Sequence, residues 1–589
     1  MRTHPRMALV VGVIAVAATV LAGCGGSSGN SKSTTGNTTT NATSGYDAAS
    51  NKVINASTKQ GGTMNLLAGG DCDSWDPQRT YYGWCWNMQR LFTRSLIGYS
   101  SVNGTKFTLA PDLATSMGTH NADFTQWSFT LKTGLKWSNG QPITPQDVQY
   151  GISRLWATDV INGGPASYFL TGIKSPPNYT GPYKMGVNNV GMTVTATTIT
   201  FHLTGANADF DYLMAMAASA PVPDKTEGGP GFVGADYTKH PMASGPFEIQ
   251  SYQPANQITF VRNPNWSQST DTIHHPLADK IVLTIDTNPA DIGQKLAAGT
   301  ADGQTDKPVN PAFQAQILTS ATLKKNADDP VSAFTQYLTV MPSVIPNLHC
   351  RLAVFYAVDK AGFLRAYGGP TAGQVASSMT PPGITGNDPT LVPYPSGSDN
   401  SGDVTKAKAE LQQCGKPSGF STKFAYSTPS PQAVLAFKAE QSALSRVGIN
   451  ITAAPQAQSS YYSSFIGSPR NIKAQGLGIA LAGWGADFPT PVGFYQSITN
   501  GNAIVQTGNS NYPSLNDQVI NKILDNGPSG VSTAADWHML NVQLMTDAVY
   551  IPMYWGKNLY YRNPRLTNIT TDNALAFGIY DWVNVGVGG

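Results

Sequence analysis

The chain has 589 residues, of which 41% are hydrophobic, 10% aromatic and 12% charged. That length and apolar content provide a large core shared among several domains and exclude a disordered chain. The formal net charge is only +2 and the basic residues form no cluster, which argues against a nucleic-acid-binding protein.

The first 23 residues have the features of a secretory leader. Arg2 and Arg6 precede an apolar run over 7–21, and the small residues Ala22 and Gly23 stand before Cys24. The run is shorter than the roughly 20 residues that cross a bilayer, which argues against the alternative, a transmembrane anchor. The segment 21–24 is similar to the lipobox of bacterial lipoproteins, which implies that the signal peptide 1–23 is removed and that Cys24 is acylated.

Residues 24–60 are predicted to be a flexible, lipid-anchored linker, because this segment is rich in Gly, Ser, Thr and Asn and offers little to bury. Its residues 25–29 match the G-x-S-x-G pattern of serine hydrolases. That motif needs a strand before it and a helix after it, and neither is expected here, so the match is set aside.

The rest of the chain alternates strand and helix signals, which predicts an α/β or α+β fold. Strands are expected at 199–203, 280–285 and 477–481. The clearest helix is expected over 432–447, where an apolar stripe is interrupted only by Glu440 and Gly448 ends the pattern. With strands at 422–426 and 449–452 it forms a β-α-β unit suited to a parallel sheet, whose carboxyl edge binds ligands.

Catalytic and cofactor motifs are missing from the sequence: there is no P-loop, no HExxH, no dinucleotide fingerprint and no EF-hand loop. No enzymatic activity and no cofactor are therefore expected. His274 and His275 are adjacent, so a strand would point them to opposite faces, and we interpret them as structural residues rather than metal ligands.

The segment 483–491 is the most informative candidate site. It follows the buried strand predicted at 477–481, and its sequence is Gly-Trp-Gly-Ala-Asp-Phe-Pro-Thr-Pro. Trp484 offers a flat apolar wall, Gly483 and Gly485 let the backbone approach a ligand, and Asp487, next to Ala486, can accept hydrogen bonds from a ligand ammonium. The alternative is that Asp487 caps its own turn while Trp484 fills a core.

A second group of aromatic residues, around Cys72 and Cys85, is either a binding wall or a small core, and the sequence leaves both readings open. Its members are Trp75, Tyr81, Tyr82, Trp84 and Trp86.

Several segments in order resemble the family 5 extracellular solute-binding proteins, from about Gly61 to the C-terminus. They are Trp75-Asp76-Pro77, the signature-like segment 129–148, the segments 243–247 and 261–266, the helix at 351–359 followed by 368–370, and the strand at 550–554. In 129–148, Lys132 stands where the family usually has arginine and Asn139 where it usually has aspartate.

The resemblance implies an α/β, bilobal, periplasmic-binding-protein-like fold of the type II, three-domain form, with a ligand cleft between two lobes that close. Two segments cross between the lobes. The implied parts are a composite lobe I (61–108, 236–332 and 558–589), an inserted domain (109–235) and lobe II (333–557).

Cys24 aside, four cysteines remain, which indicates two disulfides in an exported protein. Four cysteines allow three pairings. The pairing Cys72–Cys85 with Cys350–Cys414 is favoured because each pair falls inside one proposed lobe.

The resemblance further implies a monomeric binding protein on the extracytoplasmic face of the cell membrane, held by Cys24, that delivers a small ligand to the permease and ATPase subunits of an ABC importer. In peptide binders of the family the aspartate matched by Asp487 pairs with the ligand's α-ammonium. We therefore expect Asp487, Trp484, Gly483, Gly485, Ala486 and Trp75 to line the site.

Short peptides are the leading ligand class, but other members bind oligosaccharides or metal chelates, and the arginine that some peptide binders carry before the tryptophan is absent from 480–482. A surface sensor with the same fold and a secreted hydrolase with paired carboxylates are the competing functions.

Overall fold

The computed structural model describes residues 45–102, 106–162, 164–187, 190–224, 227, 233–428, 430–457, 460–571 and 579–588. The leader 1–23, Cys24 and most of the predicted linker lie outside these residues. In the described part, no helix is long and apolar enough to cross a membrane. Residues from Ala42 to the C-terminus form one compact unit.

Lobe I is built on a five-stranded mixed sheet with the order β11-β1-β10-β9-β8. Its strands are β11 (Gly303–Gln304), β1 (Thr63–Ala68), β10 (Lys280–Ile285), β9 (Gln257–Arg262) and β8 (Phe247–Gln253). Strand β1 runs parallel to β10 and β11, whereas β8, β9 and β10 pair antiparallel. Its helices are α1 (Gly83–Gln89), α6 (Pro289–Ala297), α7 (Pro311–Thr319) and α8 (Ala321–Lys324).

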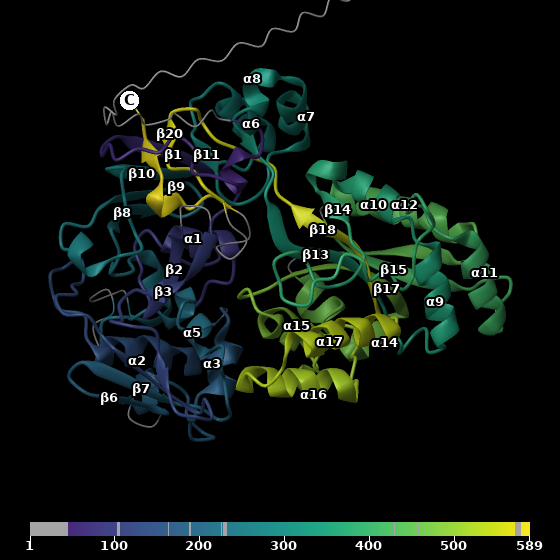
Figure 1. Ribbon diagram of the computed structural model, residues 1–589, viewed down its shortest axis with the longest axis horizontal. Coiled ribbons are helices and arrows are strands. Elements are labelled where there is room, and N and C mark those ends of the chain that lie inside the picture. The colour runs from purple at the N-terminus through teal and green to yellow at the C-terminus, as the bar shows by residue number, and fades with distance from the viewer. Residues whose placement is uncertain are drawn as a thin grey trace, which may run out of the picture. The chain divides into compact units, whose positions relative to one another are not determined.

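The inserted domain holds an antiparallel sheet with the order β4-β5-β7-β6 and the hairpin β2–β3 beside it (Figure 1). The strands are β2 (Ile97–Val102), β3 (Lys106–Pro111), β4 (Thr119–His120), β5 (Gln126–Thr130), β6 (Met192–Val194) and β7 (Thr198–His202). The helices are α2 (Pro145–Ser153), α3 (Ala166–Gly172), α4 (Pro182–Met185) and α5 (Phe210–Leu213). Helix α2 begins where Thr144 and Asp147 form a capping box.

Lobe II contains a six-stranded mixed sheet with the order β14-β18-β13-β17-β15-β16. Figure 1 shows α10 and α12 on one side of this sheet and α15, α16 and α17 on the other. The strands are β13 (Val331–Val340), β14 (Gly373–Val375), β15 (Ser421–Thr428), β16 (Asn450–Ala457), β17 (Leu477–Gly485) and β18 (Tyr550–Lys557). The helices are α9 (Leu348–Ala357), α10 (Lys360–Tyr367), α11 (Val404–Gln413), α12 (Pro431–Ser445), α14 (Pro469–Gln475), α15 (Pro491–Thr499), α16 (Gln518–Asn526) and α17 (Ala534–Thr546).

The predicted β-α-β unit is confirmed. Helix α12 starts at Pro431 because Ser430 caps it, and Gly448 with a φ of +80° follows its end. Strands β15 and β16 on either side of α12 pair in parallel, and β15 is also parallel to β17. The carboxyl ends of these three strands therefore lie at one edge of the lobe II sheet, the edge at which the candidate site was expected.

The chain crosses between the lobes twice, through the residues that join β12 (Ala327–Asp328) to β13 and β18 to β19 (Tyr560–Tyr561). Both crossings are paired, because β12 bonds to β19 and β13 to β18. A further short pair, β20 (Leu566–Thr567) with β21 (Gly586–Val587), lies in the C-terminal part of lobe I. The three larger sheets fall within the three predicted parts, except that β13 starts two residues before 333. The domain bounds themselves stay a prediction.

Residues 45–57 correct the predicted extent of the flexible linker. The backbone N–H of Asp47 donates to Ala327, that of Ala49 donates to the Asp328 carboxylate, and Ile54 forms an antiparallel bridge with Ile569. Ala49 and Ile54 are fully buried in the lobe I core. The composition predicted a tether because polar residues dominate, but two apolar side chains and the backbone hydrogen bonds hold this segment to the folded unit.

Both favoured disulfides are formed. Cys72–Cys85 joins the loop after β1 to α1, and Cys350–Cys414 joins α9 to the end of α11. Each bond lies within one lobe, as expected for bonds that restrain local loops rather than the movement of one lobe against the other.

Candidate functional site

Strand β17 carries most of the predicted site to the edge of the lobe II sheet. Trp484 is half-buried, and its indole N–H donates to the carbonyl of Phe494 in α15 over 2.7 Å. Ala486 is buried, and Asp487 follows the end of the strand and remains partly accessible. The bond to α15 holds the indole in place against the lobe II core, and the role of Trp484 as a wall for a ligand stays a prediction.

The two glycines of this strand make room for neighbouring protein side chains. A Cβ atom at Gly483 would lie 2.4 Å from the amide nitrogen of Gln336, and one at Gly485 would lie 2.8 Å from the ring of Phe334. Both neighbours stand on β13, which pairs with β17. The absent Cβ atoms therefore make room for Gln336 and Phe334, while both glycines also line the cavity beside Asp487, so the close approach of a ligand to their backbone stays a prediction.

The carboxylate of Asp487 is held by two tyrosine hydroxyls from outside lobe II. Tyr81 in lobe I donates to Asp487 Oδ2 over 3.0 Å, and Tyr168 in helix α3 of the inserted domain donates to the same atom over 2.5 Å. Within the described residues, Asp487 forms no salt bridge. Burial raises the pKa of the Asp487 carboxyl to about 6, and the hydrogen bonds from Tyr168 and Tyr81 limit the rise.

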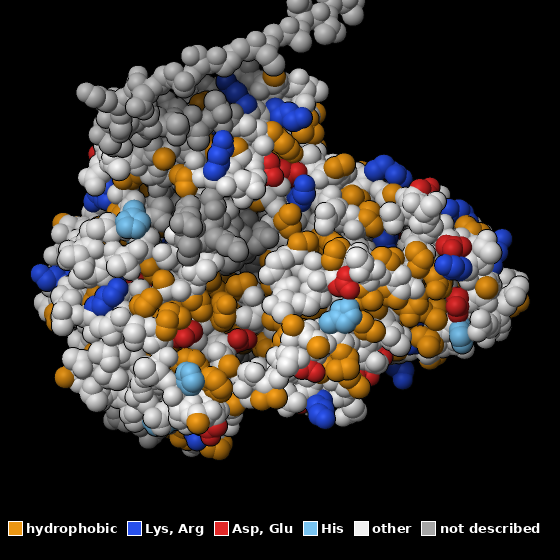
Figure 2. Space-filling model, viewed as in Figure 1, with side chains coloured by type: hydrophobic (Ala, Val, Ile, Leu, Met, Phe, Trp, Pro, Cys, Tyr) orange, Lys and Arg blue, Asp and Glu red, His pale blue; other side chains and the backbone are white. Residues whose placement is uncertain are grey.

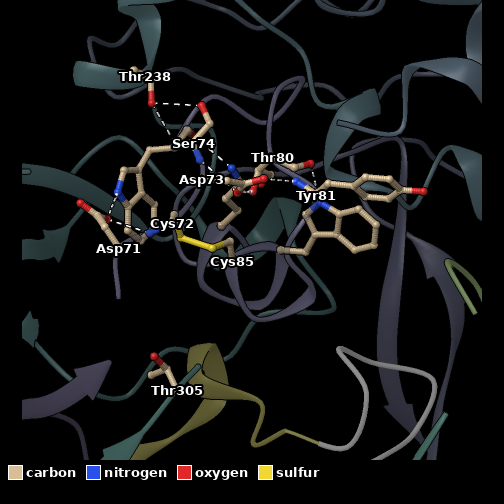
Figure 3. The surroundings of a disulfide bond; sticks show 12 residues. Asp71, Cys72, Asp73, Ser74, Thr80, Tyr81, Cys85, Thr238 and Thr305 are labelled. Carbon is tan, nitrogen blue, oxygen red and sulfur yellow. Dashed lines mark hydrogen bonds between the residues drawn. A yellow bond between two sulfur atoms is a disulfide. The ribbon is translucent and has the colours of Figure 1, made fainter. Parts of the chain in front are cut away.

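Tyr81 reaches Asp487 because the loop before α1 is tied down. The Cys72–Cys85 bond closes this loop, and the Asp73 carboxylate accepts hydrogen bonds from the Thr80 hydroxyl over 2.5 Å and from the Tyr81 backbone N–H over 2.7 Å. Figure 3 shows the Tyr81 ring extending away from the disulfide, with its backbone bonded to Asp73. The disulfide and Asp73 thus present the tyrosine hydroxyl to lobe II.

A cavity of about 770 Å³, here called cavity A, opens beside Asp487. Lobe I, the inserted domain and lobe II all contribute to its walls, and Asp487 is the one charged residue among the described residues that line it. Its described lining residues include Gly483, Trp484, Gly485, Asp487, Gln496, Ser497 and Asn502 from lobe II, Tyr81 and Trp86 from lobe I, and Ser167, Tyr168 and Thr171 from the inserted domain.

Two further cavities continue from cavity A toward the crossings between the lobes. Cavity B, of about 480 Å³, shares Tyr81, Gly83 and Phe334 with cavity A. Cavity C, of about 400 Å³, shares Lys307 and Lys557 with cavity B, and these two lysines are the charged residues that line it. The cleft therefore carries the Asp487 carboxylate at one end and, at the other, Lys307 and Lys557, which pair with Asp306 and Asp329 over 3.4 Å each.

One face of the molecule shows how charged side chains are distributed on its surface. On the face shown in Figure 2, basic and acidic side chains are interspersed and no broad basic patch appears. This agrees with the small net charge of the sequence.

Trp75 does not line the cleft, contrary to the prediction. Its ring is fully buried among Phe92, Tyr252 and Phe260 in the lobe I core, and its indole N–H donates to Asp71 over 3.2 Å. An indole fills this core because its one polar group finds a partner there. The aromatic group around the disulfide is thus divided: Trp75 belongs to a core, while Tyr81, Tyr82, Trp84 and Trp86 line cavities.

His274 is part of a buried ionic cluster. Its ring Nδ1 lies 2.9 Å from Asp271 Oδ2, and the Arg94 Nε lies 3.2 Å from the same oxygen and 2.7 Å from Asp112 Oδ1. The side chains of Asp112, Asp271 and His274 lie close enough together to suggest a metal site. The guanidinium of Arg94 already supplies the cation, so the cluster is complete as an ion-pair network.

Comparison with known proteins places this geometry in a family. Residues 108–505 match the model described as bacterial extracellular solute-binding proteins, family 5 Middle. The oligopeptide-binding protein OppA of Bacillus subtilis (strain 168) is 24% identical over 396 residues, which cover 64% of this chain and 67% of that protein.

Solved structures share the fold of this chain over most of its length. The structure titled clavulanic acid biosynthesis oligopeptide binding protein 2 is 33% identical, with a TM-score of 0.87 over 93% of this chain and 99% of that one. The murein tripeptide-binding protein MppA in its unliganded open form, 19% identical, has a TM-score of 0.67 over 90% of this chain and 98% of that one. Two lobes, an inserted domain, a cleft between them and a family match over more than half the sequence lead to one conclusion: this chain belongs to the family 5 bacterial extracellular solute-binding proteins.

Proposed function

We propose that this protein is the substrate-binding lipoprotein of an ABC importer and that it captures short peptides between its two lobes. The observation that carries the proposal is Asp487: a partly accessible carboxylate whose pKa is raised by burial, without a cationic partner among the described residues, at the wall of a cavity formed by all three parts of the chain. A ligand ammonium supplies the missing positive charge.

The remainder of the cleft suits the rest of a peptide. Beyond Ala480, the described part of β17 pairs with β13 and no longer with β15, and the Tyr461 hydroxyl bonds the Leu481 carbonyl there; in this proposal an extended ligand forms strand-like hydrogen bonds with the backbone beyond that residue. Lys307 and Lys557 line cavity C, where each ammonium group already pairs with an aspartate, Asp306 and Asp329. Two similar proteins carry the words oligopeptide-binding or oligopeptide binding in their names, which supports a peptide over a sugar or a metal chelate.

The family description and the fold support an extracytoplasmic location. In this proposal the lobes close on the peptide and the closed form is recognised by separate permease and ATPase subunits. A surface sensor would use the same capture step. Finding permease and ATPase genes beside this one would support import over sensing.

The test of peptide capture is calorimetry with trialanine and with N-acetyl-trialanine, which has the same backbone and no ammonium. We expect trialanine to bind and acetylation to weaken its binding about 100-fold, because the Asp487 carboxylate would then lie in the closed cleft without a cationic partner. Equal binding of the two peptides would contradict the role of the ammonium. Mass spectrometry of ligands carried through gentle purification separates the alternatives: a co-purified sugar or metal chelate would replace the peptide as ligand.

The lipid anchor is tested at Cys24. The change Cys24→Ser removes the thiol that would carry the diacylglycerol, so the protein is expected to leave the detergent-rich phase of a Triton X-114 separation or to retain residues 1–23. The wild-type chain from the same host is the control. If the variant keeps both the membrane partitioning and the processing of the wild type, Cys24 is not the anchor.

A further inference from the structure

A side chain of lobe II lies in the hydrophobic core of the inserted domain. Phe488 follows Asp487 directly and belongs by sequence to lobe II, yet it is only 4% exposed. Its ring meets that of Tyr168 edge-on, with centroids 5.6 Å apart, and stacks on that of Tyr212 at 5.7 Å. The other buried members of this cluster, among the described residues, lie between Leu96 and Ala218.

Polar contacts surround this ring. The hydroxyl of Thr490 donates to the carboxylate of Asp209 in the inserted domain over 2.9 Å, and it also accepts the N–H of Gly493 as the N-cap of α15. Nearby, the backbone N–H of Ala208 donates to the carbonyl of Pro528. The inserted domain therefore contacts lobe II at residues 488–490 and again beside Pro528.

Tyr168 joins this contact to the ligand site. Its ring packs on Phe488 while its hydroxyl donates to Asp487 Oδ2 over 2.5 Å. Asp487 and Phe488 are neighbours in the chain, so a movement of their backbone that withdraws the Phe488 ring also moves the Asp487 carboxylate away from Tyr168. The position of the carboxylate and the docking of the ring are mechanically coupled.

We propose that the inserted domain is a clasp that holds the cleft closed, and that Phe488 is the positioning residue through which it acts on Asp487. The inference rests on the proposed function in that Asp487 receives the ligand ammonium. When the lobes part, Phe488 leaves a socket formed by Tyr168 and Tyr212. When they close, its return buries an apolar ring, places Asp487 against Tyr168 and seals cavity A from water.

The experiment compares Phe488→Ala with Phe437→Ala. Phe437 is a buried aromatic residue of lobe II on α12 that lines none of the three cavities, so it reproduces the loss of core packing without touching the clasp. Calorimetry with trialanine gives the affinity. Spin labels at Ala196→Cys and Leu435→Cys, both at exposed positions in the inserted domain and lobe II, give the distance between these two parts with and without peptide. The chain starts at Gly25, which omits the Cys24 thiol and keeps the whole compact unit.

Phe488→Ala is expected to weaken trialanine binding about tenfold to 100-fold and to shift the label distances toward longer values, because the closed state loses the burial of one phenylalanine ring. Phe437→Ala is expected to keep both the affinity and the distances of the wild type. Phe488→Leu, which refills the socket with an apolar side chain, is expected to restore most of the affinity and serves if the alanine variant does not fold.

The remaining outcomes distinguish a failure of the clasp proposal from a failure of the peptide-capture proposal. Wild-type affinity and distances in Phe488→Ala would overturn the clasp, as would equal losses in Phe488→Ala and Phe437→Ala. If the wild type does not bind trialanine, peptide capture fails, while the distance distributions of the unliganded variants still decide whether Phe488 holds the two parts together.

Discussion

The change Asp487→Asn is expected to weaken the binding of trialanine about 100-fold while leaving the protein folded. Asparagine keeps the shape of the side chain and can still accept a hydrogen bond from Tyr81 or Tyr168, but it removes the negative charge that pairs with the ligand ammonium. Loss of one partner from a buried charge pair typically costs about 2–5 kcal/mol of binding free energy. Calorimetry at pH 7.5 measures the effect.

The control is Glu440→Gln, which makes the same acid-to-amide change at a buried position of lobe II, where burial raises the pKa of Glu440 to about 8 and keeps the carboxyl group largely protonated at pH 7.5. Glu440 is fully buried on α12, its carboxylate accepts the Asp359 N–H, and it lines none of the three cavities. Its replacement is expected to leave the affinity for trialanine unchanged. A second check uses the acetylated peptide: Asp487→Asn should bind trialanine and N-acetyl-trialanine with similar affinity. A variant that still prefers the free ammonium would remove Asp487 from the site.

The same carboxylate predicts how binding depends on pH. Burial raises the pKa of Asp487 to about 6, above the usual value for aspartate, so the unliganded site takes up a proton as the pH falls through 6. A ligand ammonium favours the ionised form, and binding at low pH must therefore release that proton. The wild-type affinity is expected to fall about tenfold between pH 7.5 and pH 5, and Asp487→Asn should flatten this profile. An unchanged slope in the variant would assign the pH dependence to another group.

The change Arg154→Ala is expected to lower the free energy of unfolding by about 3–5 kcal/mol, because it leaves two buried carboxylates without their cationic partner. Two nitrogens of Arg154 bond the Asp76 carboxylate, over 2.6 and 3.0 Å, and its Nε lies 3.2 Å from Glu227. All three side chains are fully buried. Asp76 comes from lobe I and Arg154 from the inserted domain, so the network joins two parts of the chain. Urea unfolding followed by tryptophan fluorescence measures the loss.

The matched control is Lys184→Ala in the same domain. Lys184 pairs with Asp159 over 2.5 Å, but both side chains are more than half exposed. Solvent screens such a pair, so the urea midpoint is expected to stay at the wild-type value. Equal midpoints for Arg154→Ala and the wild type would mean that the stranded carboxylates are hydrated or protonated at little cost.

Local sequence signals predicted the elements of the fold well. The stripe of apolar residues and the terminal Gly448 marked α12, and the apolar run at 477–481 marked β17, because periodicity and caps act within one or two turns of chain. Composition failed for residues 45–57. Their hydrogen bonds go to Asp328, Ile569 and other residues far along the chain, and no local property records such partners.

The residues of the candidate site likewise divide into those that the sequence indicated and those that only the structure revealed. Asp487 and Trp484 stand just beyond a buried strand and could be found from that position alone. Trp75 and Trp84 could not be separated, because both belong to one aromatic group, and only the folded lobe puts the first in a core and the second at a cavity. Tyr168 carried no sequence signal: its hydroxyl matters only because α3 lies against the end of β17.

By itself, then, the sequence predicted the β-α-β unit around α12 and the strand β17, favoured the disulfide pairing that is formed, indicated the family and singled out Asp487 as the carboxylate for a ligand ammonium, since each of these depends on residues close together or on a motif. The tertiary structure alone decided which aromatic rings face the cleft, how Tyr81 and Tyr168 hold Asp487, and that Phe488 docks in the inserted domain. These contacts join residues hundreds of positions apart, and they arise from the burial of apolar surface and the pairing of desolvated charge, which are properties of the folded chain as a whole.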